Sequence, residues 1–299
     1  MTTLLDSAAL DGADGTGTTL VRLLRAEFMK LRTTSTGWFF LTGFIVFTVA
    51  VLTINGFGSH YELYPQPGLV GRAQDLAEAA HARSPAGLAA IAASMMTSGQ
   101  RVGVLFALLL GVVIVTSEFA SQTAAVTFVT VPRRVEVIRA KVAAAACCGA
   151  LFWLVSTVMA AVATPLFLYT QHVSTSLAGW TVTRSVLLNL LGFVAWAVFG
   201  LGLGAVLRSQ MASVIAAVGV YAGSFGAMLV FTLLYNLFHQ SWLLGAPVIA
   251  PALAYAVMIM SGQAFPNAPA GWVGGIIMIG YTVALAAGGI ALTKRRDVL

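Results

Sequence analysis

The chain has 299 residues, of which 59% are hydrophobic and 9% are charged, and its formal net charge is +6. Soluble domains contain about 25% charged and about 45–50% apolar residues. Together with a mean hydropathy of +0.91, this composition excludes a water-soluble globular protein. It indicates an integral membrane protein.

The first segment, residues 1–17, is rich in Gly, Thr and Asp and has neither a basic start nor a continuous apolar core. A secretory signal peptide has both, so we expect a disordered cytoplasmic tail here. The stretch from Gly12 to Thr18 is rich in glycine, but it lacks the lysine and the preceding strand of a phosphate-binding loop. No nucleotide site is therefore expected in this segment.

Residues 18–36 are predicted to form an amphipathic helix at the membrane surface. Thr18 or Thr19 can cap it, and apolar residues recur on one side at helical spacing, at Leu20, Leu24, Phe28 and Leu31. Basic side chains on another sector would meet anionic lipid headgroups. The candidate interface residues are Arg22, Arg25, Phe28, Lys30 and Arg32. The alternative is a basic juxtamembrane segment without a helix of its own.

Six apolar stretches are long enough to cross a membrane as helices, since a crossing needs about 20 apolar residues. Strands are excluded because the stretches do not alternate polar and apolar residues. The predicted crossings are residues 38–57, 99–119, 142–166, 186–207, 211–231 and 271–293. The predicted fold class is an all-α polytopic membrane protein, in which residues 37–299 form a single domain of six transmembrane helices.

The basic residues predict the orientation, because Lys and Arg accumulate in short cytoplasmic loops. With the six crossings drawn, twelve of the sixteen basic residues fall on one side of the membrane. They lie before the first crossing, between the second and third, between the fourth and fifth, and after the last. The connection 232–270 on the other side has none. We expect both termini to be cytoplasmic, and the charge belongs to this asymmetry rather than to a nucleic-acid surface.

The connection between the second and third crossings, residues 118–134, suits a cytosolic docking element. Glu118 ends the second crossing, a weakly polar stretch follows, and Pro132 stops it before Arg133 and Arg134. Such a stretch can lie as a short helix on the membrane surface and present apolar side chains to a partner. The alternative is that residues 124–131 dip into the membrane interface.

Four short motifs occur at the ends of the predicted crossings. They are Arg25-Ala-Glu27-Phe28-Met-Lys30-Leu31-Arg32 before Trp38, Thr116-Ser117-Glu118-Phe119, Val131-Pro132-Arg133-Arg134 with Lys141, and Lys294-Arg295-Arg296-Asp297. The chain resembles the ABC-2 type transporter permeases, especially those of actinobacteria. This resemblance implies an ABC-2 exporter-type transmembrane domain, with an N-terminal amphipathic elbow helix and a coupling segment that seats in a nucleotide-binding subunit.

The resemblance also assigns roles to residues of the coupling segment. Glu118 matches the acidic residue that opens it, and Arg133 and Arg134 match the basic pair that closes it. The implied coupling residues are Glu118, Phe119, Gln122, Thr123, Phe128, Arg133 and Arg134. Family members often carry a glycine and a basic residue where this chain has Gln122 and Ala125. Either the docking contacts are less charged than usual, or the partner ATPase is dedicated to this chain.

By the same resemblance, residues 241–269 match an extracytoplasmic re-entrant hairpin. The stretch is apolar enough to enter the membrane, but several prolines interrupt it, and proline breaks helices. The alternative is a seventh and an eighth full crossing.

No cluster of residues predicts catalysis or a metal site. The histidines fall on the outer side without the spacing of metal ligands, at His60, His81, His172 and His239. Ionisable residues, which mark ion pathways inside membranes, do not occur in the middle thirds of the predicted crossings. Three glycine pairs have the four-residue spacing that permits close helix packing, within one chain or between copies; they are Gly200/Gly204, Gly219/Gly223 and Gly271/Gly275.

The sequence therefore favours a transporter that takes its energy from a separate motor. The resemblance implies the permease subunit of an ATP-binding cassette exporter in the bacterial plasma membrane, which moves a hydrophobic or amphipathic substrate such as a lipid, drug or peptide out of the cytoplasm. The implied partners are two copies of a cytosolic ATPase that binds ATP and Mg, a second permease copy or a paralogous permease, and membrane lipids. We expect the chain itself to bind no cofactor or metal and to have no enzymatic activity. The alternatives are a non-transporting membrane partner of a cytosolic ATPase and an ion-coupled carrier.

Overall fold

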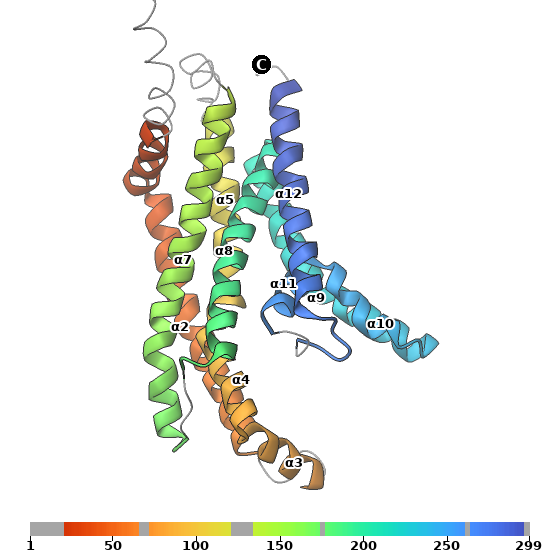
Figure 1. Ribbon diagram of the computed structural model, residues 1–299. Helices are drawn as coiled ribbons and strands as arrows, with labels where there is room; N and C mark the ends of the chain where they lie inside the picture. Colours follow the sequence, from red (N-terminus) through yellow and green to blue (C-terminus); the bar gives the residue numbers. More distant parts are fainter. Residues whose placement is uncertain (1–20, 66–71, 121–133, 174–176, 261–263, 296–299) are drawn as a thin grey trace, which may run out of the picture.

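The computed structural model describes residues 21–65, 72–120, 134–173, 177–260 and 264–295 (Figure 1). All regular elements in these ranges are helices. The long ones are α2 (Ser35–Leu63), α5 (Gly103–Ala120), α7 (Arg134–Thr170), α8 (Trp180–Leu207), α9 (Gln210–Phe238) and α12 (Gly271–Arg295). The shorter ones are a helix over residues 21–33, α3 (Arg72–Ala82), α4 (Pro85–Met96), η1 (Ser98–Gln100), α10 (Trp242–Gly245), η2 (Ala246–Ile249) and α11 (Pro251–Met260).

Within the described ranges, five helices are long and apolar enough to cross a membrane, namely α2, α7, α8, α9 and α12. A sixth candidate is the pair formed by residues 242–249 and α11, which is bent by 107°. The prediction of an all-α, multi-pass membrane protein is confirmed at this level. The predicted second crossing corresponds to α5, which is a shorter apolar helix and follows α4 after the 3₁₀ turn η1.

The central helix of the bundle is α8, because it packs against α5, α7 and α12. Its Trp196 is fully buried, and in the same core cluster Phe44 of α2 stacks on Phe152 of α7 with ring centroids 4.6 Å apart. Glycines bring α5 and α8 into backbone contact, since a Cβ atom at Gly111 or Gly200 would overlap a carbonyl oxygen of the other helix. Close packing of this kind is how small residues hold membrane helices together.

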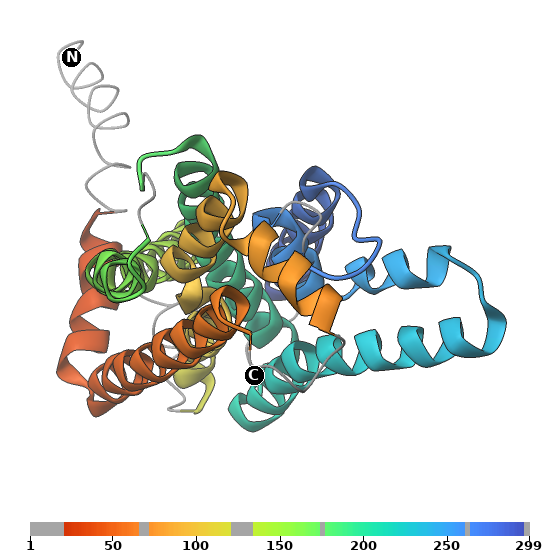
Figure 2. The ribbon, with the colours of Figure 1, turned by 90° about the horizontal axis from the view of Figure 1, so that it is seen from below.

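Helix α9 leaves the bundle obliquely and α10 returns alongside it, so that the two form an arm (Figures 1 and 2). Few α9 side chains are buried, and these are Ser213, Ala217 and Ser224. The arm is attached at its base, where the Ala252 N–H of α11 donates a hydrogen bond to Ser224 Oγ at 3.2 Å. Helix α11 is itself buried against α12, α8 and α9. The bend between α10 and α11 therefore lies where the arm joins the bundle.

Several helices extend beyond the predicted crossings. Helix α7 begins eight residues before residue 142, and α8 begins six residues before residue 186. At 1.5 Å per residue α7 is about 55 Å long, whereas the hydrocarbon core is about 30 Å thick. The predicted ends followed charge-free runs, but a helix continues into the interface as long as its backbone hydrogen bonds are satisfied.

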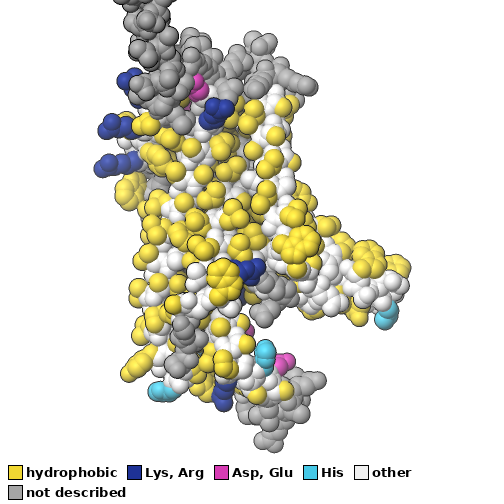
Figure 3. Space-filling model, viewed as in Figure 1, with side chains coloured by type: hydrophobic (Ala, Val, Ile, Leu, Met, Phe, Trp, Pro, Cys, Tyr) yellow, Lys and Arg dark blue, Asp and Glu magenta, His cyan; other side chains and the backbone are white. Residues whose placement is uncertain are grey.

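The segment predicted as an amphipathic helix, residues 18–36, contains the helix over residues 21–33 and the start of α2. The chain changes direction at Thr34, and a Cβ atom at Gly37 would overlap the Leu31 carbonyl oxygen. The predicted tail, residues 1–17, lies outside the described residues. On the face shown in Figure 3 the surface is mainly apolar, and Lys and Arg side chains gather near residues 21–33.

Candidate functional site: a buried ion cluster at the charged end

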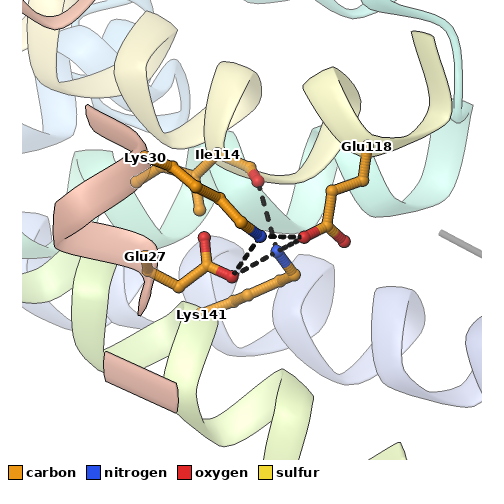
Figure 4. Close-up of polar contacts among 5 residues, drawn as sticks. All are labelled: Glu27, Lys30, Ile114, Glu118 and Lys141. Carbon is orange, nitrogen blue, oxygen red and sulfur yellow. Dashed lines mark hydrogen bonds and ion pairs between the residues drawn. The ribbon is translucent and has the colours of Figure 1, made fainter. Parts of the chain in front are cut away.

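Three elements converge at the end of the bundle that carries residues 21–33 (Figure 4). Glu27 and Lys30 lie one turn apart on the helix over residues 21–33, Glu118 lies in the last turn of α5, and Lys141 lies in the second turn of α7. We call these four residues the ion cluster. Helices α5 and α7 flank residues 121–133, which lie outside the described residues.

The two lysines of the ion cluster bridge its two carboxylates. Lys141 Nζ donates hydrogen bonds to Glu118 Oε1 at 2.7 Å, to Glu27 Oε1 at 2.9 Å and to the Ile114 carbonyl oxygen at 3.4 Å. Lys30 Nζ donates to Glu118 Oε1 at 2.7 Å and to Glu27 Oε1 at 3.2 Å. An ammonium group has three N–H donors, so every donor of Lys141 has an acceptor.

Three of the four residues of the ion cluster are buried, and its two lysines balance the charge of its two glutamates. The exposed fractions are 8% for Glu27, 6% for Glu118 and 4% for Lys141. In the part of the chain that the structure describes, these three are the buried Asp, Glu, Lys and Arg residues. Removing an ion from water carries a penalty of several kcal/mol that only close opposite charges offset. The three helices are therefore held together by charges that cannot separate without large cost.

Lys30 is the outer member of the ion cluster, since half of its side chain is exposed. Partial burial alone would lower its pKa, but the hydrogen bond and the attraction to Glu118, and then those to Glu27, outweigh it. The pKa of Lys30 is raised above its ordinary value of 10.5. Lys30 therefore stays charged at neutral pH.

Arg208 ties two further helices to the same end. It ends α8 in the left-handed backbone region, with φ of 54°. Its guanidinium lies over the Phe119 ring of α5, 5.6 Å from the centroid, and its Nη2 donates a hydrogen bond to the Leu292 carbonyl oxygen of α12 at 3.4 Å. The segments predicted to share the cytoplasmic side thus meet at one end of the bundle.

The space beside the ion cluster is small. A crevice of about 40 Å³ lies between α5, α7, α8 and α12, whereas ligand pockets usually measure about 300–1,000 Å³. Among the described residues no group of three or more His, Cys, Asp or Glu side chains could hold a metal ion. In the described part of the chain, the ion cluster joins three helices and leaves little open space between them.

Some of the predicted coupling residues lie in the described part of the chain, and others lie outside it. Glu118 belongs to the ion cluster, and Phe119 is half-buried beneath Arg208. Arg134 is the first residue of α7. The predicted residues that lie outside the described residues are Gln122, Thr123, Phe128 and Arg133.

The predicted interface residues lie on the helix over residues 21–33. Arg22, Arg25 and Arg32 are exposed, and Phe28 is 39% exposed. Lys30, predicted for the same surface, turns toward Glu118 and Glu27. Their roles at a lipid surface stay predictions.

Sequence reasoning did not assign Glu27 or Lys141 to the site. One signal was present, because Glu27 is an acidic residue in an otherwise basic helix and stands three residues before Lys30, the spacing of neighbouring side chains on a helix. Lys141 lies directly before the charge-free run that begins at residue 142. Neither pattern identifies a partner across 114 residues of chain.

No protein-family model and no curated protein matches the sequence. The resemblance to ABC-2 permeases therefore stays a prediction that rests on the four motifs.

Proposed function

We propose that the chain is the transmembrane permease subunit of an ATP-binding cassette exporter of the ABC-2 type. The observation that carries this proposal is the ion cluster, which joins the helix over residues 21–33 to both helices that flank residues 121–133. A permease driven by a cytosolic motor needs a rigid connection between the docking segment and its membrane helices. Because buried opposite charges resist separation, a push on residues 121–133 would move the three helices together.

The distribution of buried charge supports an external source of energy. Ion-coupled carriers place ionisable side chains inside the membrane, where they form the ion pathway. The buried Asp, Glu, Lys and Arg residues of the described chain are all in the ion cluster, at one end of the bundle. The proposed motor is a cytosolic ATPase in two copies, which supplies the ATP and Mg sites.

We infer the orientation of the chain in the membrane from the basic residues at the end that carries the ion cluster. Lys and Arg collect on the cytoplasmic side of membrane proteins, so the ion cluster faces the cytoplasm of a bacterial cell and both termini lie there. The bent pair of residues 242–249 and α11 then lies toward the outer side, as a re-entrant hairpin within residues 241–269. Its bend of 107° fits a segment that enters and leaves by the same face.

The cargo proposed for this route is hydrophobic or amphipathic. The exposed surfaces of the long helices are apolar; on α9 they include Ile215, Leu229 and Leu237, which are 67%, 68% and 73% exposed. Such surfaces face lipid, or they face a second permease across a central route. Lipids, drugs and peptides fit this environment, whereas inorganic ions need polar groups along their path.

The proposal is tested by co-expressing the chain with a candidate cytosolic ATPase, such as one found in a neighbouring reading frame, and reconstituting the purified complex in vesicles. We expect ATP hydrolysis that rises with an amphipathic substrate, together with ATP-dependent movement of that substrate toward the outer face. Hydrolysis that is insensitive to all such compounds, without transport, would instead indicate a non-transporting membrane partner.

A pair of variants tests the docking segment itself. Phe128→Ala should weaken binding of the ATPase and uncouple hydrolysis from transport without lowering the amount of protein in the membrane. The matched control is Phe39→Ala, at a residue of α2 that is 79% exposed. If both variants bind the ATPase and transport as well as the unmodified protein, the coupling role of residues 118–134 is wrong.

A further inference from the structure

A groove runs between α2 and α7 in the half of the bundle away from the ion cluster. The two helices lie side by side (Figure 1). The groove has a volume of about 890 Å³, which is within the range of about 300–1,000 Å³ typical of ligand pockets. Its floor is formed by Leu52 and Gly56 of α2 and by Met95 of α4, and its α7 wall includes Ala163 and Phe167. Met95 is 2% exposed and Leu52 is 8% exposed, so the floor is part of the packed core.

The length and the position of the groove match one leaflet of a membrane. On α2 it extends from Val49 to His60, a distance of about 16 Å at 1.5 Å per residue. This is about half of the hydrocarbon thickness of about 30 Å. The apolar end of the groove, at Val49, lies near the middle of the bundle. The other end lies where α2 and α7 finish.

Most polar groups of the groove lie at that other end; Thr53 also lines the groove, and its hydroxyl donates to the Val49 carbonyl oxygen at 2.9 Å. His60 Nδ1 lies 2.7 Å from Gln171 Oε1, and the Tyr64 hydroxyl donates a hydrogen bond to the Gln171 carbonyl oxygen at 2.9 Å. An amide oxygen only accepts, so the Nδ1 atom of His60 carries the proton of this bond when Gln171 is oriented this way. Arg83 stacks over the Tyr64 ring, with its guanidinium 4.7 Å from the centroid. The groove thus has a mainly apolar body and a polar mouth, and Arg83 lies next to this mouth through Tyr64 rather than in the groove lining.

We propose that this groove binds a phospholipid of the outer leaflet, with one acyl chain along Leu52, Gly56 and Ala163 and with its phosphate at the mouth beside Arg83. The groove has the length of one leaflet, and Arg83 lies next to its mouth. This arrangement fits an acyl chain joined to an anionic headgroup. Inside a bilayer the acyl chain gains no free energy from leaving water, so van der Waals packing against the groove must favour the bound state, and the guanidinium pairs with phosphate. The assignment to the outer leaflet rests on the orientation proposed above, whereas the binding site itself involves neither an ATPase nor transport.

The test is the retention of phospholipid by the purified full-length chain. The protein is taken from vesicles of phosphatidylglycerol and phosphatidylethanolamine into detergent, and the lipid that stays bound is counted by native mass spectrometry. The test variant is Ala163→Phe, which places a ring in the groove. The control is Ala161→Phe, because Ala161 is exposed and is not among the groove residues. We expect one retained phospholipid for the unmodified protein and for Ala161→Phe, and about tenfold less for Ala163→Phe, the effect of losing about ten carbon–carbon packing contacts.

A second pair keeps the test decisive if Ala163→Phe does not fold. A Cβ atom at Gly56 would lie 3.6 Å from Phe167, an ordinary contact, whereas a Cβ atom at Gly58 would meet open space. Gly56→Leu should therefore displace the lipid, and Gly58→Leu should not. Arg83→Gln should lower the retention of phospholipid while leaving the thermal stability of the protein unchanged.

Two results would overturn the proposal. One is equal retention in the groove variants and their controls, or no retention by the unmodified protein. The other is efficient disulfide cross-linking of Ala163→Cys between two copies, in a background in which Cys147 is replaced by alanine, since the groove would then be an interface with a second copy.

Discussion

Lys141 and Glu118 form a buried ion pair, with Nζ and Oε1 2.7 Å apart, between the two helices that flank residues 121–133. Counted over the whole residue, Lys141 and Glu118 are 4% and 6% exposed. The pair closes the base of the connection that the sequence marks as the docking segment, and Glu27 joins it from the helix over residues 21–33. In the proposed mechanism, the strength of this link decides whether a docking segment within residues 118–134 and the bundle move as one body.

Replacing Lys141 should destabilise the protein far more than replacing Lys30. Lys141→Met leaves Glu27 and Glu118 with one counter-ion that is half exposed, and an uncompensated buried charge costs about 3–5 kcal/mol. Lys30→Met should cost less, because water screens an exposed pair. The free energy of unfolding of each variant in detergent, measured by denaturant titration, gives the comparison. Equal losses for the two variants would show that the ion cluster is not buried as described.

The stability of the protein should fall in strong alkali through Lys30. The pKa of Lys30 in the folded protein lies above 10.5 because of Glu118 and Glu27. A group whose pKa is raised on folding stabilises the folded state fully below its unfolded pKa, and this stabilisation is lost as the pH rises through the folded pKa. The difference in thermal midpoint between the unmodified protein and Lys30→Gln should be constant from neutral pH to just below 10.5 and shrink above it. A difference that stays constant through that range would contradict the assignment.

Two glycine-to-alanine changes should have different effects on the stability of the protein. Gly200→Ala forces a methyl group onto the α5 backbone at Leu108 and should destabilise the protein by about 1–3 kcal/mol. Gly219 of α9 faces open space, so Gly219→Ala should be neutral or stabilising by up to about 1 kcal/mol, because alanine favours helix more than glycine. Thermal unfolding in detergent measures both. Similar destabilisation by both changes would mean that Gly219 is packed against another helix.

The hydrogen bond from the Tyr255 hydroxyl to Asn189 Oδ1, at 2.5 Å, should contribute to the packing of α11 on α8. Both residues are buried, and hydrogen bonds between membrane helices contribute about 0.6 kcal/mol on average and up to about 1.7 kcal/mol. Tyr255→Phe should lower the free energy of unfolding by an amount in this range. Tyr281→Phe is the control, since the Tyr281 hydroxyl donates to the Ile249 carbonyl oxygen in an exposed place. A larger loss for the control would contradict the account.

The apolar helices could be predicted from the sequence because length and the absence of charge suffice to identify them. Residues 209–293 contain no Asp, Glu, Lys or Arg, and the structure places α9, α11 and all but the last two residues of α12 within them. The ends of the helices were less predictable, as α7 shows, because interfacial turns are polar and still helical. The oblique course of α9 away from the bundle (Figure 1) has no local signal in the sequence, because it depends on tertiary packing at the base of the arm.

The ion cluster could be predicted only in part. Glu118 and Lys30 were named from the sequence, but for separate roles at a docking surface and at a lipid surface. Their contact across 88 residues depends on the tertiary arrangement of three helices. The glycine pairs show the same limit. Gly200 and Gly204 pack against α5, whereas Gly219 and Gly223 face open space, although both pairs have the same spacing.

The central claim is that the end of the bundle with the ion cluster faces the cytoplasm, where a motor can dock. It is tested most directly by labelling single cysteines with a membrane-impermeant maleimide in intact cells and in inside-out vesicles, in a chain whose Cys147 and Cys148 are replaced by alanine. Ala26, near the ion cluster, and Ala80, at the opposite end, are both exposed. The account predicts that Ala26→Cys is labelled only in inside-out vesicles and Ala80→Cys only in intact cells. Labelling of Ala26→Cys in intact cells would place the ion cluster outside the cell and contradict the account.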